Sequence, residues 1–317
     1  MEGALEVVLV LLLAAHLLMV DVAMIGPLAS AWLDARGRRR GDATADRAGL
    51  LLARLSTWGL TGGIVIGAPL LAMRWWQDDG AYFDAVAALP PSRLWFAGFE
   101  LLFYFACMGA YTALWRRWQR WRFAHRLLAV AAATNLLMHF PALFIIISVI
   151  GQRADLLAGP LDSGEFRRLL VDGEVLSRVV HVWLAAVAVT GAVVMEVGLR
   201  LSADAASAPS ATRLIRGGAL VALVAALAQV PVGFWVTLEM PEPARAPLMG
   251  GDVVATGLFL ASLGLALVLL QYLAAVALGD VGAKPIRRAL AVLGLLVVLM
   301  VATRTRADRH ARDMRRT

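Results

Sequence analysis

Long runs of apolar residues without charge constrain this chain more than any other feature of its sequence. Eight runs follow one another, at roughly 4–33, 50–73, 94–115, 127–151, 177–199, 214–238, 252–278 and 286–303. A helix needs about 20 apolar residues to cross the hydrocarbon core of a membrane. Only helices and closed barrels can span, and continuous rather than alternating runs favour helices. The sequence therefore predicts an all-α, polytopic membrane helix bundle with about eight transmembrane helices.

The overall composition supports the same interpretation. Hydrophobic residues make up 60% of the chain, whereas soluble globular domains contain about 45–50%. The formal net charge is +7, and its arginines flank the apolar runs, which is typical of membrane topology rather than of nucleic-acid binding. We therefore expect the lipid bilayer, and no nucleic acid, as a partner.

The links between the runs are too short to hold a soluble domain. We expect one transmembrane domain over residues 1–303 and a basic tail over 304–317. The N-terminus lacks a basic leader, so the first run is expected to be a retained helix rather than a cleaved signal peptide. Cys107 is the single cysteine, which excludes an internal disulfide, and no CxxCH motif for covalent haem attachment occurs.

Lysine and arginine residues in the links predict the direction of the chain across the membrane. Segments 34–49 and 116–126 hold five arginines each, so both are expected on the cytoplasmic side and the N-terminus outside. Eight crossings then place the tail 304–317 outside as well, although it carries six arginines. Either the last run does not cross the membrane, or this tail is an exception to the rule.

Ionisable residues within the apolar runs are functional candidates, because a charged or polar group costs free energy in hydrocarbon. His16, Glu100, His139 and His181 lie in four different runs. Imidazole is a common ligand of metals and of haem, but a membrane histidine also serves as a hydrogen-bonding group between helices. Glu100 is either interfacial or part of a proton path. Asp21 is another costly group, for which the sequence names no partner.

Other notable residues have structural interpretations. His125 and His310 lie in basic flanks and are expected to be solvated surface residues. Pro141 and Pro231 are expected to kink their helices. Three glycine pairs are expected to permit close helix approach, and they are Gly62 with Gly63, Gly217 with Gly218, and Gly250 with Gly251.

Several stretches resemble subunit I of the cytochrome bd quinol oxidases, and they occur in the same order. "SRVVHVWLAAVAVTGA" (177–192) is similar to that family's fifth helix, where a basic residue precedes a haem-ligating histidine. "NLLMHFP" (135–141) resembles NxWMQxP of the fourth helix, with histidine where glutamine is usual. "FAGFELLF" (96–103) contains the match to a glutamate of the third helix. "LTGG" (60–63) resembles VTG of the second helix, and "PLMGGDVVATG" (247–257) the start of the seventh.

The resemblance implies a set of cofactor-binding residues. His181 and Met249 would bind a low-spin haem b, with Arg178 placed to pair with a haem propionate. His16 would ligate a second haem, and His139 is a candidate replacement ligand near it. Glu100 would be the catalytic residue, in a proton path. The expected cofactors are therefore one or two haems b together with quinone.

The chain also departs from the family pattern. The long outer link that helps to bind quinol is replaced by the short segment 239–252, and the GRQPW signature and the carboxylate of the last run are missing. The resemblance, with these departures, therefore implies a haem-b-bearing subunit of the bacterial inner membrane. It would be an oxidoreductase component that passes electrons between the quinone pool and a partner membrane or periplasmic redox protein. Two alternatives stay open: a divergent terminal oxidase that reduces oxygen, and a haem-free structural subunit of a respiratory complex.

Overall fold

The computed structural model describes the chain apart from residues 1, 77–79, 119, 154–155, 157–158 and 317, and apart from the side chains of residues 2 and 310–316. Every regular element within the described residues is helical, so the expected all-α fold is confirmed. The long helices are α1 (Glu2–Arg40), α2 (Ala43–Trp76), α4 (Pro91–Ala113), α5 (Arg122–Ile150), α7 (Gly173–Leu201), α8 (Ala208–Glu239), α10 (Val253–Leu278) and α11 (Ala283–Arg316). The short ones are α3 (Gly80–Ala88), α6 (Ser163–Leu170), α9 (Glu242–Arg245) and the 3-10 helix η2 (Ala246–Met249).

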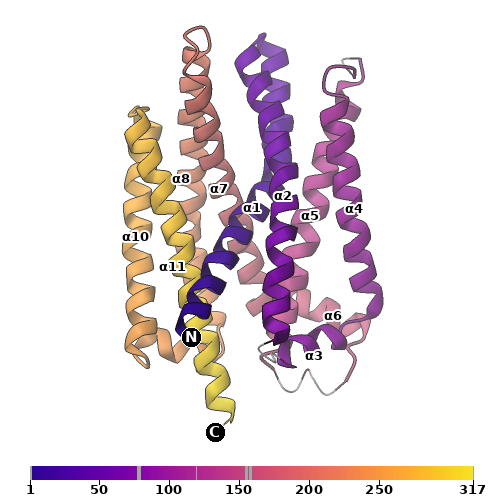
Figure 1. Cartoon of the computed structure of the whole chain (residues 1–317), viewed down its shortest axis with the longest axis vertical. Coiled ribbons are helices and arrows are strands. Elements are labelled where there is room, and N and C mark those ends of the chain that lie inside the picture. Colours follow the sequence, from indigo (N-terminus) through magenta and orange to yellow (C-terminus); the bar gives the residue numbers. More distant parts are fainter. Residues whose placement is uncertain (1, 77–79, 119, 154–155, 157–158, 317) are drawn as a thin grey trace.

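The eight long helices stand side by side and alternate in direction along the chain (Figure 1). All eight are long and apolar enough to cross a membrane, which confirms the predicted multi-pass bundle. Both termini lie at one end of the bundle, named here the terminal end (Figure 1). The opposite end carries the links 41–42 and 114–121 and is named the arginine end. The side of the membrane that each end faces stays a prediction.

Aspartates begin three of the helices at the terminal end. Asp162 accepts hydrogen bonds from the backbone N–H groups of Gly164 and Glu165, and these bonds lower its pKa. Asp172 caps α7 by accepting from Glu174 N at 3.0 Å. Asp252 caps α10 by accepting from Ala255 N at 2.7 Å. Each cap satisfies a backbone donor that has no partner within its own helix.

Glycines let two pairs of helices approach closely, as expected for Gly63 and Gly218. A Cβ atom added at Gly191 of α7 would lie 2.7 Å from the carbonyl oxygen of Gly218 in α8, and the reverse addition would lie at 2.6 Å. A Cβ at Gly63 of α2 would lie 2.8 Å from a side-chain carbon of Val20 in α1. Gly250 instead has φ 107°, so its role is a turn and not a helix contact.

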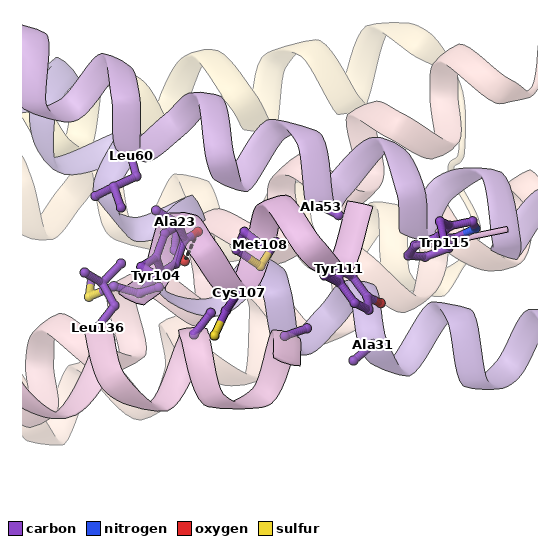
Figure 2. Packing of buried hydrophobic residues seen from close by; sticks show 14 residues of the cluster. Ala23, Ala31, Ala53, Leu60, Tyr104, Cys107, Met108, Tyr111, Trp115 and Leu136 are labelled. Carbon is purple, nitrogen blue, oxygen red and sulfur yellow. Dashed lines mark hydrogen bonds between the residues drawn. The ribbon is translucent and has the colours of Figure 1, made fainter. Parts of the chain in front are cut away.

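Two proline residues inside helices free a carbonyl that a neighbouring helix then satisfies. Pro27 of α1 lacks the N–H that would bond to Ala23, and the hydroxyl of Tyr104 in α4 donates to that carbonyl at 3.0 Å (Figure 2). Pro141 of α5 likewise frees Leu137, whose carbonyl accepts from Trp183 Nε1 of α7 at 2.9 Å. These bonds tie α1 to α4 and α5 to α7 without leaving a polar group unpaired in hydrocarbon.

A cluster of paired polar residues lies at the arginine end, and it corrects the expectation for His125. The His125 ring is only 2% exposed, and it stacks on Tyr111 with ring centroids 4.3 Å apart. Its Nε2 atom lies 2.8 Å from the Tyr111 carbonyl oxygen. Asp34 is buried beside it and pairs with both Arg38 and Arg126. His125 is therefore a core residue, because its ring packs against Tyr111 and Trp115 at the end of α4.

Arginines of the tail find acidic partners at the terminal end. Helix α11 continues through residue 303 without a break, so the expected domain boundary falls inside a helix. Arg306 Nη2 lies 2.7 Å from Asp252 Oδ2, and Arg309 Nη1 lies 3.0 Å from Glu6 Oε2. The last run therefore has the length and composition of a span, and acidic residues of the terminal end neutralise part of its tail. The side chain of His310 lies outside the described residues.

Candidate functional site

His181 lies inside α7, about 12 Å from the start of that helix at Gly173. Its backbone carbonyl accepts a hydrogen bond from Gln229 Nε2 of α8 at 3.2 Å. Its ring nitrogen Nδ1 is buried and has no hydrogen-bond partner. A buried polar atom without a partner costs about 1–3 kcal/mol, and such atoms in a native structure call for an explanation such as a ligand.

Arg178 lies one helical turn before His181, but its guanidinium has a partner in its own helix. It is 9% exposed, and its Nη2 atom contacts Glu174. Its Nε atom is buried without a hydrogen-bond partner. Glu174 therefore occupies one of the guanidinium donors that the family resemblance assigned to a haem propionate. Pairing of Arg178 with a propionate stays a prediction, and it would use the Nε donor.

His16 is held in a defined orientation by α2. Its Nδ1 atom lies 2.8 Å from the carbonyl oxygen of Gly63. A carbonyl only accepts, so Nδ1 carries the proton and Nε2 keeps a lone pair. A Cβ atom at Gly67 would lie 3.2 Å from His16 Cε1, so that glycine makes room for the ring. The sequence analysis missed Gly67, although its spacing of four residues from Gly63 was a usable signal.

Glu100 and His139 are brought together across α4 and α5. Glu100 is 4% exposed, and its Oε1 atom contacts His139 Nδ1. Asn135, one turn before His139, donates to the backbone carbonyl of Glu100 at 3.0 Å. The His139 side chain itself is 51% exposed. Glu100 is therefore buried behind a histidine that faces the bundle's surface.

Met249 is placed differently from the other candidates. It lies in η2, before α10 begins, and 59% of its surface is exposed. His181 lies well inside α7, so the two residues do not share the environment that two axial ligands of one haem need. Met249 as placed does not fit that role, and its ligation stays a prediction that requires η2 to move.

Two further observations bear on the cofactors. In the part of the chain that the structure describes, no three His, Cys, Asp or Glu side chains group together as ligands for a bare metal ion. A haem takes its axial ligands singly or in pairs, and His16 and His181 each offer an imidazole within the bundle. The residues present therefore fit axial ligation by histidine better than ligation by methionine.

A cavity of about 750 Å³ lies at the arginine end, away from all of these residues. It is lined by both basic and acidic side chains of α1, α2, α8 and the link before α8. Asp42 lies in it and accepts from Thr44 N and Ala45 N at 3.1 Å each. Burial opposes ionisation of Asp42, but hydrogen bonds from Ala45 and Ser210 and the charge of Arg213 outweigh it and lower its pKa. The cavity is therefore a paired, polar region rather than part of the candidate site.

Comparison with known proteins identifies the fold. No protein-family model matches the chain, and no curated protein matches it by sequence. A chain of the bd oxidase from Geobacillus thermodenitrificans has a similar structure, with a TM-score of 0.73 over 96% of this chain and 86% of that chain. The sequences are 13% identical over the match. The class that the structure defines is therefore an all-helical, multi-pass membrane protein with a bd-oxidase-like fold, and the likeness extends to the fold alone.

Proposed function

We propose that this chain is a haem-b-bearing electron-transfer subunit of a bacterial inner membrane. It passes electrons between the quinone pool and a partner redox protein. The fold is that of a bd oxidase chain, and the motifs around His181, His139 and Glu100 supply the resemblance to subunit I. The missing carboxylate of the last run argues against oxygen reduction by this chain alone.

The observation that carries this proposal is the unpartnered Nδ1 atom of His181 within an apolar bundle. An imidazole buried without a hydrogen bond is costly unless something else occupies its lone pair. Haem iron, when bound, would supply one-electron redox chemistry to this position. His181 would hold it as an axial ligand, and neutral imidazole can ligate through either ring nitrogen.

His16 supports a second haem by a separate argument. The Gly63 carbonyl fixes the proton on Nδ1, so Nε2 is presented as the ligating atom. A second residue that holds the far nitrogen of a ligating histidine is the usual arrangement in metal sites. The surrounding helices exclude water and lower the local dielectric, which is the protein's contribution to a redox site.

Optical spectroscopy of the purified chain tests the proposal. We expect a reduced-minus-oxidised spectrum with a low-spin haem b signal, and one or two haems per chain by pyridine haemochrome. The variant His181→Ala is expected to lose the low-spin signal, whereas His125→Gln, at the arginine end, is expected to keep it. A purified, folded chain without any haem would overturn the proposal in favour of a structural subunit.

A further inference from the structure

The His139 side chain faces outward from the middle part of a membrane span. It lies about 16 Å from the end of α5 at Ile150, and half of its side chain is exposed. Half of the thickness of the hydrocarbon core is about 15 Å. An exposed imidazole at this depth therefore faces lipid or another apolar environment, not bulk water, and it carries the cost of an unsolvated polar group.

Glu100 determines which ring nitrogen faces outward. The carboxyl group of Glu100 contacts Nδ1 from the buried side, so Nε2 is the ring nitrogen that faces outward. Nε2 has no hydrogen bond from the described residues. When the carboxylate accepts from Nδ1, Nε2 carries a lone pair and presents one hydrogen-bond acceptor to the membrane.

Aromatic side chains are exposed on the two helices that carry Glu100 and His139. The Phe96 ring lies edge-on to the His139 ring, with centroids 5.6 Å apart. Other large apolar residues are exposed on the same two helices, and they include Trp95, Phe99, Phe103 and Phe144. A flat aromatic ligand would find ring faces here for stacking contacts, which add about 0.5–1.5 kcal/mol for each pair beyond area burial.

We propose that His139, Glu100 and Phe96 form a binding site for the headgroup of a membrane quinol. A quinol hydroxyl donates to His139 Nε2, and the quinol ring packs against Phe96. The ligand must reach the site through hydrocarbon, carry a hydroxyl donor and present a flat apolar ring, and a quinol combines these three properties. The ligand class rests on the proposed function, in which the chain exchanges electrons with the quinone pool.

This site differs in place from the outer link between α8 and α10. That link is short here and consists of α9, η2 and their flanks. Glu100 acts as a positioning residue, because it touches His139 and fixes its tautomer without reaching the ligand. His139 touches the ligand and selects for the reduced headgroup, whose hydroxyl donates, over the oxidised headgroup, whose carbonyl oxygens only accept.

The test measures binding of short-chain probes to the full chain in lipid nanodiscs. The probes are decylubiquinol, decylubiquinone and the O-methylated decylubiquinol, which lacks hydroxyl donors. We expect decylubiquinol to bind about tenfold more tightly than the other two, since one hydrogen bond of about 1.4 kcal/mol corresponds to that ratio. An azido-quinol photolabel, which keeps the hydroxyl donor, is expected to react within segment 95–103 or 135–144, located by peptide mass spectrometry.

Three variants distinguish loss of this binding site from general damage to the fold. His139→Phe, which removes the acceptor but keeps a ring, is expected to abolish the preference for the reduced probe. Glu100→Gln is expected to weaken the preference, because the amide no longer fixes the proton on Nδ1. Met138→Leu is the matched control: Met138 is the exposed neighbour of His139 on the same helix, and the variant is expected to bind as the parent does.

Two outcomes would overturn the proposal. One is equal binding of the three probes by the parent chain with no effect of His139→Phe. The other is protection of this surface from the photolabel by a second membrane subunit, which would make His139 an interface residue. The haem spectrum is recorded on the same samples, so a chain that carries haem but fails these tests retains the proposed function and loses only this site.

Discussion

The histidine at the arginine end and the histidines in the rest of the bundle differ in their hydrogen bonding. At the arginine end, His125 is buried, stacked on Tyr111 and bonded through Nε2 to a backbone carbonyl. In the other part of the bundle, His181 keeps a buried nitrogen without any partner, and His139 faces outward with its Nε2 open. The paired histidine is explained by its packing, whereas a buried ring nitrogen without a partner calls for a separate explanation.

Two buried acidic residues, Asp34 and Glu100, also differ in their partners. Asp34 at the arginine end is buried between two arginines, and Arg126 Nε lies 2.7 Å from its Oδ2 atom. Glu100 is buried against a single histidine that reaches the surface. The first arrangement holds helices α1 and α5 together, and the second leaves hydrogen-bonding capacity available to a ligand. The paired charges and the proposed site therefore lie at different levels of one bundle.

The largest effect is expected when a charge is removed from the arginine end. Asp34→Ala leaves Arg38 and Arg126 without their buried partner, and we expect a loss of about 3–5 kcal/mol in the free energy of unfolding. Unfolding in a graded series of denaturing detergent measures it. Haem content, measured on the folded fraction, is expected to stay unchanged. A folded Asp34→Ala protein of parental stability would show that this cluster is not the structural anchor inferred here.

The next test inserts a methyl group where the backbones of α7 and α8 lie in contact. Gly191→Ala places a Cβ atom 2.7 Å from the Gly218 carbonyl, and the backbones must separate. We expect a loss of about 2–3 kcal/mol, comparable with overpacking of a core. Gly98→Ala in α4 is the control, because a Cβ there meets nothing within 4 Å. That control is expected to be neutral or slightly stabilising, and a control as damaging as Gly191→Ala would contradict the argument.

Two histidine variants sharpen the comparison directly. His125→Ala removes a stacked ring and a buried hydrogen bond, and we expect a loss of about 2–3 kcal/mol in stability with the haem spectrum intact. His181→Ala removes an unpartnered polar atom, so we expect the stability of the haem-free chain to change by less than about 1 kcal/mol. Haem titration and unfolding of both variants measure the two effects. The reverse pattern would mean that His181 is the structural residue of the pair.

Orientation is tested with single cysteines on a chain whose own Cys107 is buried. Ala45 is fully buried, so exposed Ala43 at the arginine end and exposed Ala87 in α3 are the suitable positions. With the arginine end in the cytoplasm, Ala87→Cys is expected to react with a membrane-impermeant maleimide in intact cells. Ala43→Cys is expected to react only after lysis. Labelling in the reverse order would invert the predicted topology.

The smallest expected effect is a pH dependence at the terminal end. Hydrogen bonds from Arg306 and from Ala255 N lower the pKa of Asp252 from its usual value of 3.8. A lowered folded-state pKa stabilises the fold above the unfolded pKa, and this contribution is lost as pH falls through the folded value. We expect the parent to exceed Asp252→Asn in thermal midpoint at pH 6, and the difference to shrink below about pH 4. A difference independent of pH would remove ionisation of Asp252 as its cause.

The sequence by itself determined the helices. A run of about 20 apolar residues has few alternatives in hydrocarbon, because every backbone N–H and C=O group must be bonded within its own segment. The segments 4–33 and 177–199 therefore become α1 and α7, with two to seven residues added at each end. The close approach at Gly63 and the caps at Asp172 and Asp252 also follow from local chemistry that the sequence displays.

Only the tertiary structure decided which polar groups meet. Glu100 and His139 lie 39 positions apart in the sequence, and their contact depends on the rotation of α4 against α5. His125 was expected at the surface because it stands among arginines, but packing against Tyr111 and Trp115 buries it. Met249 was expected at a haem, and η2 leaves it exposed. The length of an apolar run is a local property, and it is enough to specify a helix. A site depends on the relative rotation and depth of several helices, which no single segment encodes.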